Sequence, residues 1–175
     1  GLGDVYKRQI KNDVLEVMAN GSLNYTVKGI CIGMKVTWNY TPPTNGGDTF
    51  TSIKKGSKAT LKIVQDEKNG FVKELYIQKE PDIDNRTFEA QLQKTVEQLQ
   101  ITYPFLSVKN KKNGTYLIDI PQEKRLGHEE HFSKVAKAFL HYVHNQDMPE
   151  WENENTLAKY YITTTAVEMA KKGNK

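Results

Sequence analysis

The sequence has 175 residues, of which 37% are hydrophobic and 26% charged, and its formal net charge is +4 at pH 7. This length suits one domain with a sizeable core, and the composition excludes a disordered or fibrous chain. The lysines are interleaved with acidic residues, which does not indicate a nucleic-acid partner, and no apolar run approaches the about 18 residues of a membrane span.

The first nine residues, GLGDVYKRQ, do not match the sequence pattern of the residues that follow, and they begin without methionine. They look like the translated sequencing-adapter junction of assembled reads. We therefore expect residues 1–9 to be a non-native junction and residues 10–175 to be the tail of a longer protein that is cut off upstream. The true N-terminus would then be missing, so the sequence does not distinguish a cytoplasmic from a periplasmic location.

The next region is rich in β-forming residues. The segment VLEVMA at 14–19, followed by Asn20-Gly21, predicts a hairpin, because Asn-Gly tolerates positive φ at both central turn positions. The apolar residues of the run 23–40 occupy odd positions up to Val27 and even positions from Ile30 onward. A one-residue slip moves every side chain to the other face of a strand, so a bulge or break is predicted near Lys28-Gly29.

The single cysteine, Cys31, lies inside this apolar run and excludes an internal disulfide. It is interpreted as a small, buried hydrophobic residue. After the predicted break, Cys31 and Gly33 share the face opposite the apolar row, where small side chains favour close approach by another element.

The remaining elements alternate between strands and helices. A helix is capped by Asp84 or Asn85, carries an apolar stripe through Val96, and ends at Pro104. Prolines and Asn-Gly pairs separate the other segments. The predicted strands are 58–65, 71–78, 105–109 and 115–120, a loop covers 44–48, and the closing helices are 128–145 and 153–171.

This order predicts an α+β fold, with a mainly antiparallel, open-faced β-sheet and helices packed on one face. The open face, which carries aromatic residues, would need a partner.

All four histidines fall on the predicted helix 128–145. At 100° per residue, an apolar stripe that we expect to be buried runs through Phe132, Val135, Ala136, Phe139 and Val143. His128 lies on this stripe at the first turn, His131 on its flank, and His141 and His144 on the solvent side. The four cannot converge on one metal, and the spacing of His128 and His131 is i, i+3 instead of the i, i+4 of zinc proteases. No metal site is predicted.

Few residues stand out as candidates for chemistry. His128 is interpreted either as a packed residue that starts a helix or as a side chain aimed at a pocket. Asp48 and Thr49 are either turn formers or ligand contacts. Trp38 is either a core residue or part of an interface or of a substrate wall. The absence of G-x-G-x-x-G and G-x-S-x-G leaves the chain without a dinucleotide fingerprint or a hydrolase elbow. On its residues alone, the sequence describes an α+β domain with no complete catalytic set.

Several stretches in order resemble a known family: VLEVMANGSLNYTVKG, VTWNYTPPTNGGDT, KGSKATLKI, GHEEHF and PEWENENTLAKYYITTTAVEMAKK. They are similar to the C-terminal domain of oxidoreductases of the Gfo/Idh/MocA type, relatives of glucose-fructose oxidoreductase and inositol dehydrogenase, in a branch common in Bacteroidetes. The likeness runs from about residue 13 to residue 172.

The resemblance implies an NAD(P)-dependent oxidoreductase acting on a sugar or polyol-like substrate. NAD or NADP would be bound by a missing N-terminal Rossmann domain, which would also carry the catalytic lysine. This chain would contribute part of the substrate pocket and a homo-oligomer interface on the sheet face, and it would be inactive alone. The substrate-binding candidates are Trp38, Asp48, Thr49 and His128, of which His128 matches the stretch GHEEHF of the family branch.

The sequence departs from the branch pattern at three positions. The pattern has a histidine, an aromatic residue and an arginine where this sequence has Phe50, Thr51 and Lys55. The loop's substrate role therefore rests on Asp48 and Thr49. The alternative is a free-standing, non-enzymatic α+β module that binds a carbohydrate or a protein.

Overall fold

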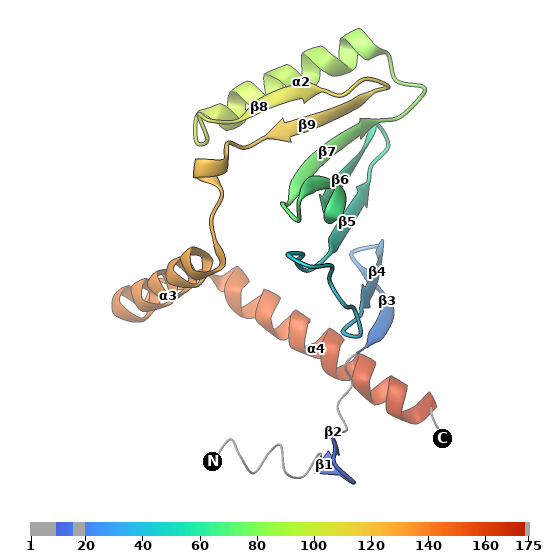
Figure 1. Ribbon diagram of the computed structural model, residues 1–175. Coiled ribbons are helices and arrows are strands. Elements are labelled where there is room, and N and C mark those ends of the chain that lie inside the picture. Colours follow the sequence, from blue (N-terminus) through green and yellow to red (C-terminus); the bar gives the residue numbers. More distant parts are fainter. Residues whose placement is uncertain (1–9, 16–19, 174–175) are drawn as a thin grey trace. The chain divides into compact units, whose positions relative to one another are not determined.

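The computed structural model describes residues 10–15 and 20–173 (Figure 1). They form an α+β fold of antiparallel sheets and helices, as the sequence predicts. The chain divides into two compact units. One consists of Pro42–Ala138; the other draws on the chain before Pro42 and after Ala138. The predicted non-native junction, residues 1–9, lies outside the described residues.

The first strands are short. β1 (Ile10–Lys11) pairs with β2 (Val14–Leu15) across Asn12 and Asp13, which have φ values of 49° and 63°. The predicted strand at 14–19 is thus described only as β2, because residues 16–19 lie outside the described part. Gly21 is not a turn residue but the first residue of β3 (Gly21–Val27).

The predicted break at Lys28-Gly29 is a two-residue hairpin turn, with φ values of 49° and 79°. It joins β3 to β4 (Ile30–Val36) in an antiparallel pair with Val27 opposite Ile30. Paired residues point to the same face, so the turn places the odd apolar residues of β3 beside the even ones of β4. The change of phase in the sequence therefore marks a reversal of the chain.

β4 ends at Val36, earlier than the sequence predicts. Trp38 and Tyr40 lie beyond the strand, and the backbone amide of Trp38 donates a hydrogen bond to Asn20 Oδ1 at 2.6 Å. Asn20 therefore ties the segment after β4 to the segment before β3 instead of forming the predicted Asn-Gly turn.

The unit Pro42–Ala138 holds a five-stranded antiparallel sheet in the order β5-β6-β7-β9-β8. Sequence reasoning missed β5, whose only apolar residues are Phe50 and Ile53, so it shows little alternation. The other four strands lie within about three residues of their predicted ends. The strands are β5 (Phe50–Lys55), β6 (Ala59–Gln65), β7 (Glu74–Lys79), β8 (Ser107–Asn110) and β9 (Thr115–Asp119).

The turn between β6 and β7 is a capped 3-10 helix, η1 (Glu67–Asn69). Asp66 Oδ1 accepts from the Lys68 amide, and Asn69 Oδ1 accepts from the Asp66 amide, each at 2.9 Å. Gly70 ends the turn with φ 63°, a left-handed conformation that glycine adopts without steric cost. A second 3-10 helix, η2 (Gln122–Lys124), comes after β9.

Helix α2 (Asn85–Gln100) contacts β8 and packs on one face of the sheet (Figure 1). Asp84 is its N-cap, as predicted, and accepts from the Thr87 amide at 2.8 Å. The ring of Phe88 lies 5.7 Å from that of Tyr116 between centroids. The buried hydrophobic residues of the described chain are Val96, Tyr116, Leu117 and Ile118, so the core lies at α2 and β9.

Two helices close the described chain, α3 (His128–Asn145) and α4 (Glu150–Gly173). α3 has its predicted bounds, but the stripe that was predicted to be buried is exposed, with Phe132 at 64% and Phe139 at 62%. Tyr160 and Tyr161 of α4 are also exposed. Trp151 lies inside α4, which begins three residues before the predicted start at residue 153. Among the helices within residues 10–15 and 20–173, none combines the length and apolar character that crossing a membrane requires.

Candidate functional site

The four predicted substrate-binding residues are divided between the two units. Trp38 belongs to the unit that includes β3 and β4, and its side chain is 75% exposed, so it is not a core residue. Asp48, Thr49 and His128 belong to the unit Pro42–Ala138 and are also exposed. No hydrogen bond among the described residues joins His128 to Asp48 or Thr49.

Asp48 and Thr49 directly precede β5, on the loop that begins at Pro43. A tight turn shapes the loop: the amide of Gly46 donates to the carbonyl oxygen of Pro43 at 2.7 Å. Phe50 comes next, and the ammonium of Lys73 lies 5.0 Å from the centroid of its ring. The loop therefore presents a carboxylate and a hydroxyl to solvent, beside a cation held over an aromatic face.

His128 is the first residue of α3, and its ring lies 4.8 Å from that of Phe132, one turn along the helix. The amide of Gly127 donates to Glu130 Oε2 at 2.9 Å, which anchors the helix start. Both Glu129 and Glu130 lie in the first turn, where carboxylates interact favourably with the helix dipole. These contacts fix the position of His128 and leave its side chain exposed to solvent.

Another histidine, His141, makes polar contacts at the far end of α3. Its Nε2 is 3.1 Å from Asp147 Oδ2, and the Asn145 amide nitrogen is 3.0 Å from its Nδ1. His141 and Asp147 are both exposed, as the sequence predicts for His141. Within residues 10–15 and 20–173, no three histidine, cysteine or acidic side chains gather to hold a metal ion.

A polar concavity of about 370 Å³ lies in the unit Pro42–Ala138, over the ends of β6 and β7 and the turn between them. The Tyr76 hydroxyl donates to Glu74 Oε2 at 2.5 Å, and this bond, with burial, raises the pKa of Tyr76 to about 12. Asp66, Lys68 and Lys111 also line the concavity. Sequence reasoning did not bring these residues together, because their separation along the chain gives no motif.

A second polar cluster ties α2 to the sheet. Glu89 Oε1 accepts from the Tyr116 hydroxyl at 2.8 Å and from the Asn110 side-chain amide at 3.1 Å. Burial and the bond to Glu89 raise the pKa of Tyr116 to about 12. Since all three groups are used in bonding one another across the packed face, the cluster holds the fold together.

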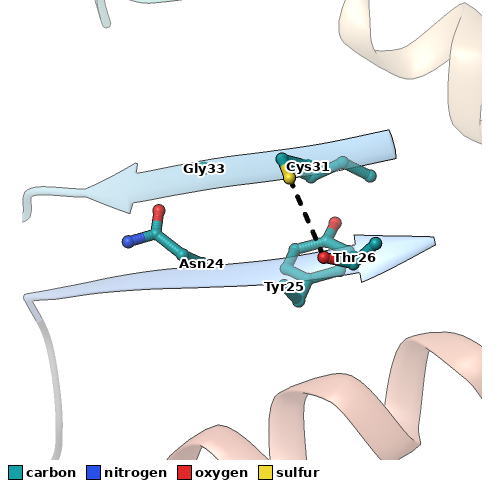
Figure 2. Close-up of a pocket in the computed structure, with 6 residues that line it drawn as sticks. Asn24, Tyr25, Thr26, Cys31 and Gly33 are labelled. Atoms are coloured by element: carbon teal, nitrogen blue, oxygen red, sulfur yellow. Dashed lines mark hydrogen bonds between the residues drawn. The ribbon is translucent and has the colours of Figure 1, made fainter. Parts of the chain in front are cut away.

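The hairpin β3-β4 has a shallow concavity of about 260 Å³ on the face that carries Asn24, Thr26, Cys31 and Gly33 (Figure 2). Cys31 Sγ and Thr26 Oγ1 are 4.0 Å apart. The thiol is exposed, whereas the sequence predicted a small buried hydrophobic residue. Asn24 Oδ1 lies 3.0 Å from the point where a Cβ on Gly33 would stand, so a glycine there accommodates the asparagine side chain.

Comparisons with known proteins agree over nearly the whole chain. A family model described as "Putative oxidoreductase C terminal domain" matches residues 2–171. A crystal structure of a putative oxidoreductase from Parabacteroides merdae is 39% identical in sequence and has a TM-score of 0.87. The similarity covers 97% of this chain and 39% of the Parabacteroides chain, so this chain spans well under half of that protein. A comparison with curated proteins found no match.

Proposed function

Because this chain belongs to the family of oxidoreductase C-terminal domains, we propose that it serves an NAD(P)-dependent oxidoreductase of the Gfo/Idh/MocA type, acting on a sugar or polyol-like hydroxyl. The observation that carries the proposal is the match of residues 2–171 to this family, supported by the 39% identity to the Parabacteroides oxidoreductase. The carbohydrate-type substrate rests on the sequence resemblance to sugar and inositol dehydrogenases.

In this proposal, the nicotinamide cofactor is held by a part of the protein outside this chain, and it supplies the hydride chemistry. The residues of this chain would bind the substrate and orient its reacting hydroxyl toward the cofactor. The chain alone would therefore be inactive.

The substrate contacts are assigned to Asp48 and Thr49 in the loop before β5, to His128 at the start of α3, and to Trp38 after β4. Their exposure in the structure leaves all four side chains accessible to a ligand. A carboxylate and a hydroxyl can bond sugar hydroxyls, and an indole can stack against the apolar face of a sugar ring.

The protein would form a homo-oligomer through the face of the five-stranded sheet opposite α2. The strand register places Ile53, Lys62, Tyr76, Leu117 and Lys109 in one row across that face. Lys109 forms an ion pair with Asp119 at 2.6 Å on the same face. Subunit interfaces commonly combine apolar and aromatic side chains with a polar rim, and this row offers both.

The experiment is to clone the complete gene from genomic DNA, purify its product, and measure reduction of NAD and NADP with a panel of sugars and polyols. Turnover by the complete protein, together with none by the 175-residue chain alone, would support the proposal. A gene product without a nucleotide-binding region and without turnover would favour a free-standing binding module instead.

Variants of the complete protein then test the assigned residues. Asp48→Ala and His128→Ala are expected to lower kcat/KM by about tenfold or more, because each removes a polar contact to the substrate. His144→Ala, which changes an exposed histidine of the same helix α3, is the matched control and should leave kcat/KM unchanged. Equal effects of His128→Ala and His144→Ala would remove His128 from the substrate site.

A further inference from the structure

The sequence contains four Asn-Gly pairs, and their hydrogen bonds differ in the structure. The pairs are Asn20-Gly21, Asn45-Gly46, Asn69-Gly70 and Asn113-Gly114. Asparagine is a chemically labile residue, and a following glycine, which has no Cβ, leaves the next backbone nitrogen open to the asparagine side chain. Attack by that nitrogen requires a glycine amide that is free of other hydrogen bonds.

In two of the pairs, the glycine amide is held by a turn. Gly46 donates to the carbonyl oxygen of Pro43 at 2.7 Å, and Gly70 donates to that of Glu67 at 3.2 Å. The side chain of Asn69 is also fixed, because its Oδ1 and its Nδ2 each form a hydrogen bond of 2.9 Å. Both glycine nitrogens are therefore occupied in the folded protein.

In the pair Asn20-Gly21, the glycine amide is held by the hairpin β3-β4. Hydrogen-bonded pairs alternate along an antiparallel ladder, and counting from the turn at 28–29 makes Gly21 and Val36 a hydrogen-bonded pair. The Asn20 side chain is bonded as well, since its Oδ1 accepts from the Trp38 amide. This pair is therefore protected at both reacting groups.

The pair Asn113-Gly114 lacks such protection. The two residues have φ values of 51° and 71° and form the centre of a turn that the Thr115 amide closes by donating to the Lys112 carbonyl oxygen at 2.9 Å. Among the described residues, the Gly114 amide has no acceptor, and the exposed Asn113 side chain has no hydrogen-bond partner. The peptide group between them is held by Gln78, whose Nε2 donates to the Asn113 carbonyl oxygen at 3.1 Å.

We infer that Asn113 is a site of spontaneous deamidation in the folded protein. Solvent base removes the proton of the Gly114 amide, and the nitrogen attacks Cγ of Asn113. The new N–Cγ bond closes a succinimide ring, the Cγ–Nδ2 bond breaks, and Nδ2 takes a proton from solvent and leaves as ammonia. Water then opens the ring at either carbonyl and gives aspartate or isoaspartate at position 113. This reaction needs only water, and it does not depend on the proposed oxidoreductase activity.

The isoaspartate product would alter the end of the hairpin β8-β9. Isoaspartate routes the main chain through the former side chain, so the turn becomes longer by one methylene group. The Gly114 carbonyl oxygen accepts from the Lys79 amide at 2.8 Å, which ties the turn to the end of β7. A longer turn displaces this acceptor. The Lys79 amide of a converted sample should therefore exchange its hydrogen faster than that of a fresh sample.

The experiment incubates the 175-residue chain at mildly alkaline pH and follows all four pairs by peptide mass mapping, with ammonia release measured in parallel. Asn113 is expected to convert at least about tenfold faster than Asn45, because freeing the Gly46 amide costs a backbone hydrogen bond. Conversion of Asn113 no faster than that of Asn45 would overturn the inference.

The same incubation in urea is the control for local sequence. Unfolding frees all four glycine amides, so the four pairs should then convert at similar rates. If Asn113 kept the same lead in urea, neighbouring residues in the sequence would set the order, and the structural site would be rejected.

Variants test the reacting groups. Asn113→Gln keeps an amide but lengthens the side chain, so the five-membered ring cannot form and conversion at this position should stop. Gln78→Ala removes the hydrogen bond to the peptide group and should speed conversion of Asn113 several-fold, with Asn45 unchanged. Gln93→Ala, at an exposed position on α2, is the matched control and should change neither rate. If Gln78→Ala speeds all four pairs equally, conversion runs through the unfolded chain, and the site is rejected.

Discussion

Asp84 shows how one side chain fixes the start of a helix. Its Oδ1 accepts from both the amide and the hydroxyl of Thr87, each at 2.8 Å, and these bonds lower the pKa of Asp84. A lowered folded-state pKa means that the stabilisation is present above the unfolded pKa and is lost as the pH falls through the folded value. The ionised carboxylate therefore stabilises α2 at neutral pH.

Asp84→Ala is expected to lower the melting temperature at pH 7, because the cap of α2 is removed. The difference from the unaltered protein should shrink as the pH falls below about 4, where the carboxylate becomes protonated. Thermal melts at pH 7 and at acid pH measure this. Asp82→Ala, two residues earlier, is the control, and an equal loss from it would show that Asp84 has no special role.

The two hydrogen-bonded tyrosines predict behaviour at alkaline pH. The pKa values of Tyr76 and Tyr116 are both raised to about 12, by their bonds to Glu74 and Glu89 and by burial. A raised folded-state pKa gives stability that is complete below the unfolded value of about 10 and is lost as the pH rises toward about 12. Stability should therefore fall between these two values.

Tyr116→Phe is expected to destabilise the protein by about 1–2 kcal/mol at pH 7. The change removes the hydroxyl that donates to Glu89, and Tyr116 is only 4% exposed. Between about pH 10 and 12 the variant should lose less stability than the unaltered protein. Urea unfolding at a series of pH values measures both effects. Tyr103→Phe, at a ring that is 48% exposed, should change neither.

At the scale of an element, helix α2 depends on one buried side chain. Val96 is 2% exposed, whereas Leu99, three residues along the same predicted stripe, is 45% exposed. Val96→Ala should cost about 2 kcal/mol, from two lost methyl groups and the cavity that they leave, and Leu99→Ala should cost less than half of that. Denaturant unfolding of the two variants decides. Equal losses would contradict the packing seen at α2.

The two turn residues of the hairpin β3-β4, Lys28 and Gly29, differ in how well they tolerate the positive φ of the turn. Gly29, with φ 79°, suits the left-handed region, but Lys28 adopts φ 49° without glycine's freedom. Lys28→Asn would create the Asn-Gly pair that this turn type favours. It should stabilise the hairpin by about 0.5 kcal/mol, and Gly29→Val should destabilise it by about 1–2 kcal/mol.

The amide chemical shifts and hydrogen exchange of residues 21–36 report on this hairpin directly. Lys35→Asn, within β4, is the matched control for Lys28→Asn and should not stabilise the hairpin. If Lys28→Asn slows exchange no more than Lys35→Asn does, turn conformation does not limit the stability of the hairpin.

At the scale of the whole molecule, apolar surface is the dominant feature. The exposed large side chains of α3 include Phe132, Val135, Phe139, Leu140 and Val143. Exposed apolar groups in such a continuous stripe mark interaction surfaces or aggregation sites. The double change Phe132→Ser and Phe139→Ser should therefore reduce binding of a hydrophobic dye and self-association, and it should leave the unfolding free energy nearly unchanged.

Dye fluorescence, sedimentation and denaturant unfolding test this expectation together. Val96→Ser is the contrasting variant, because Val96 is buried and its change should lower stability. A large loss of stability from the α3 double variant would mean that its stripe packs within the chain.

Local patterns in the sequence determined much of this protein. The change of apolar phase at Lys28-Gly29 predicted the chain break, Asp84 predicted the start of α2, and the period of 128–145 predicted α3 with its bounds. The order of motifs predicted an oxidoreductase C-terminal domain, which the family match confirmed. Each of these signals lies within a few residues along the chain, where hydrogen bonding and side-chain period act directly.

Only the tertiary structure decided the rest. β5 is paired to β6 by backbone hydrogen bonds that require little from its polar side chains, so the sequence shows no strand there. The exposure of the α3 stripe and the gathering of Asp66, Glu74, Tyr76 and Lys111 depend on which elements meet in space. Strand register and packing set those meetings, and neither is expressed in any local pattern of residues.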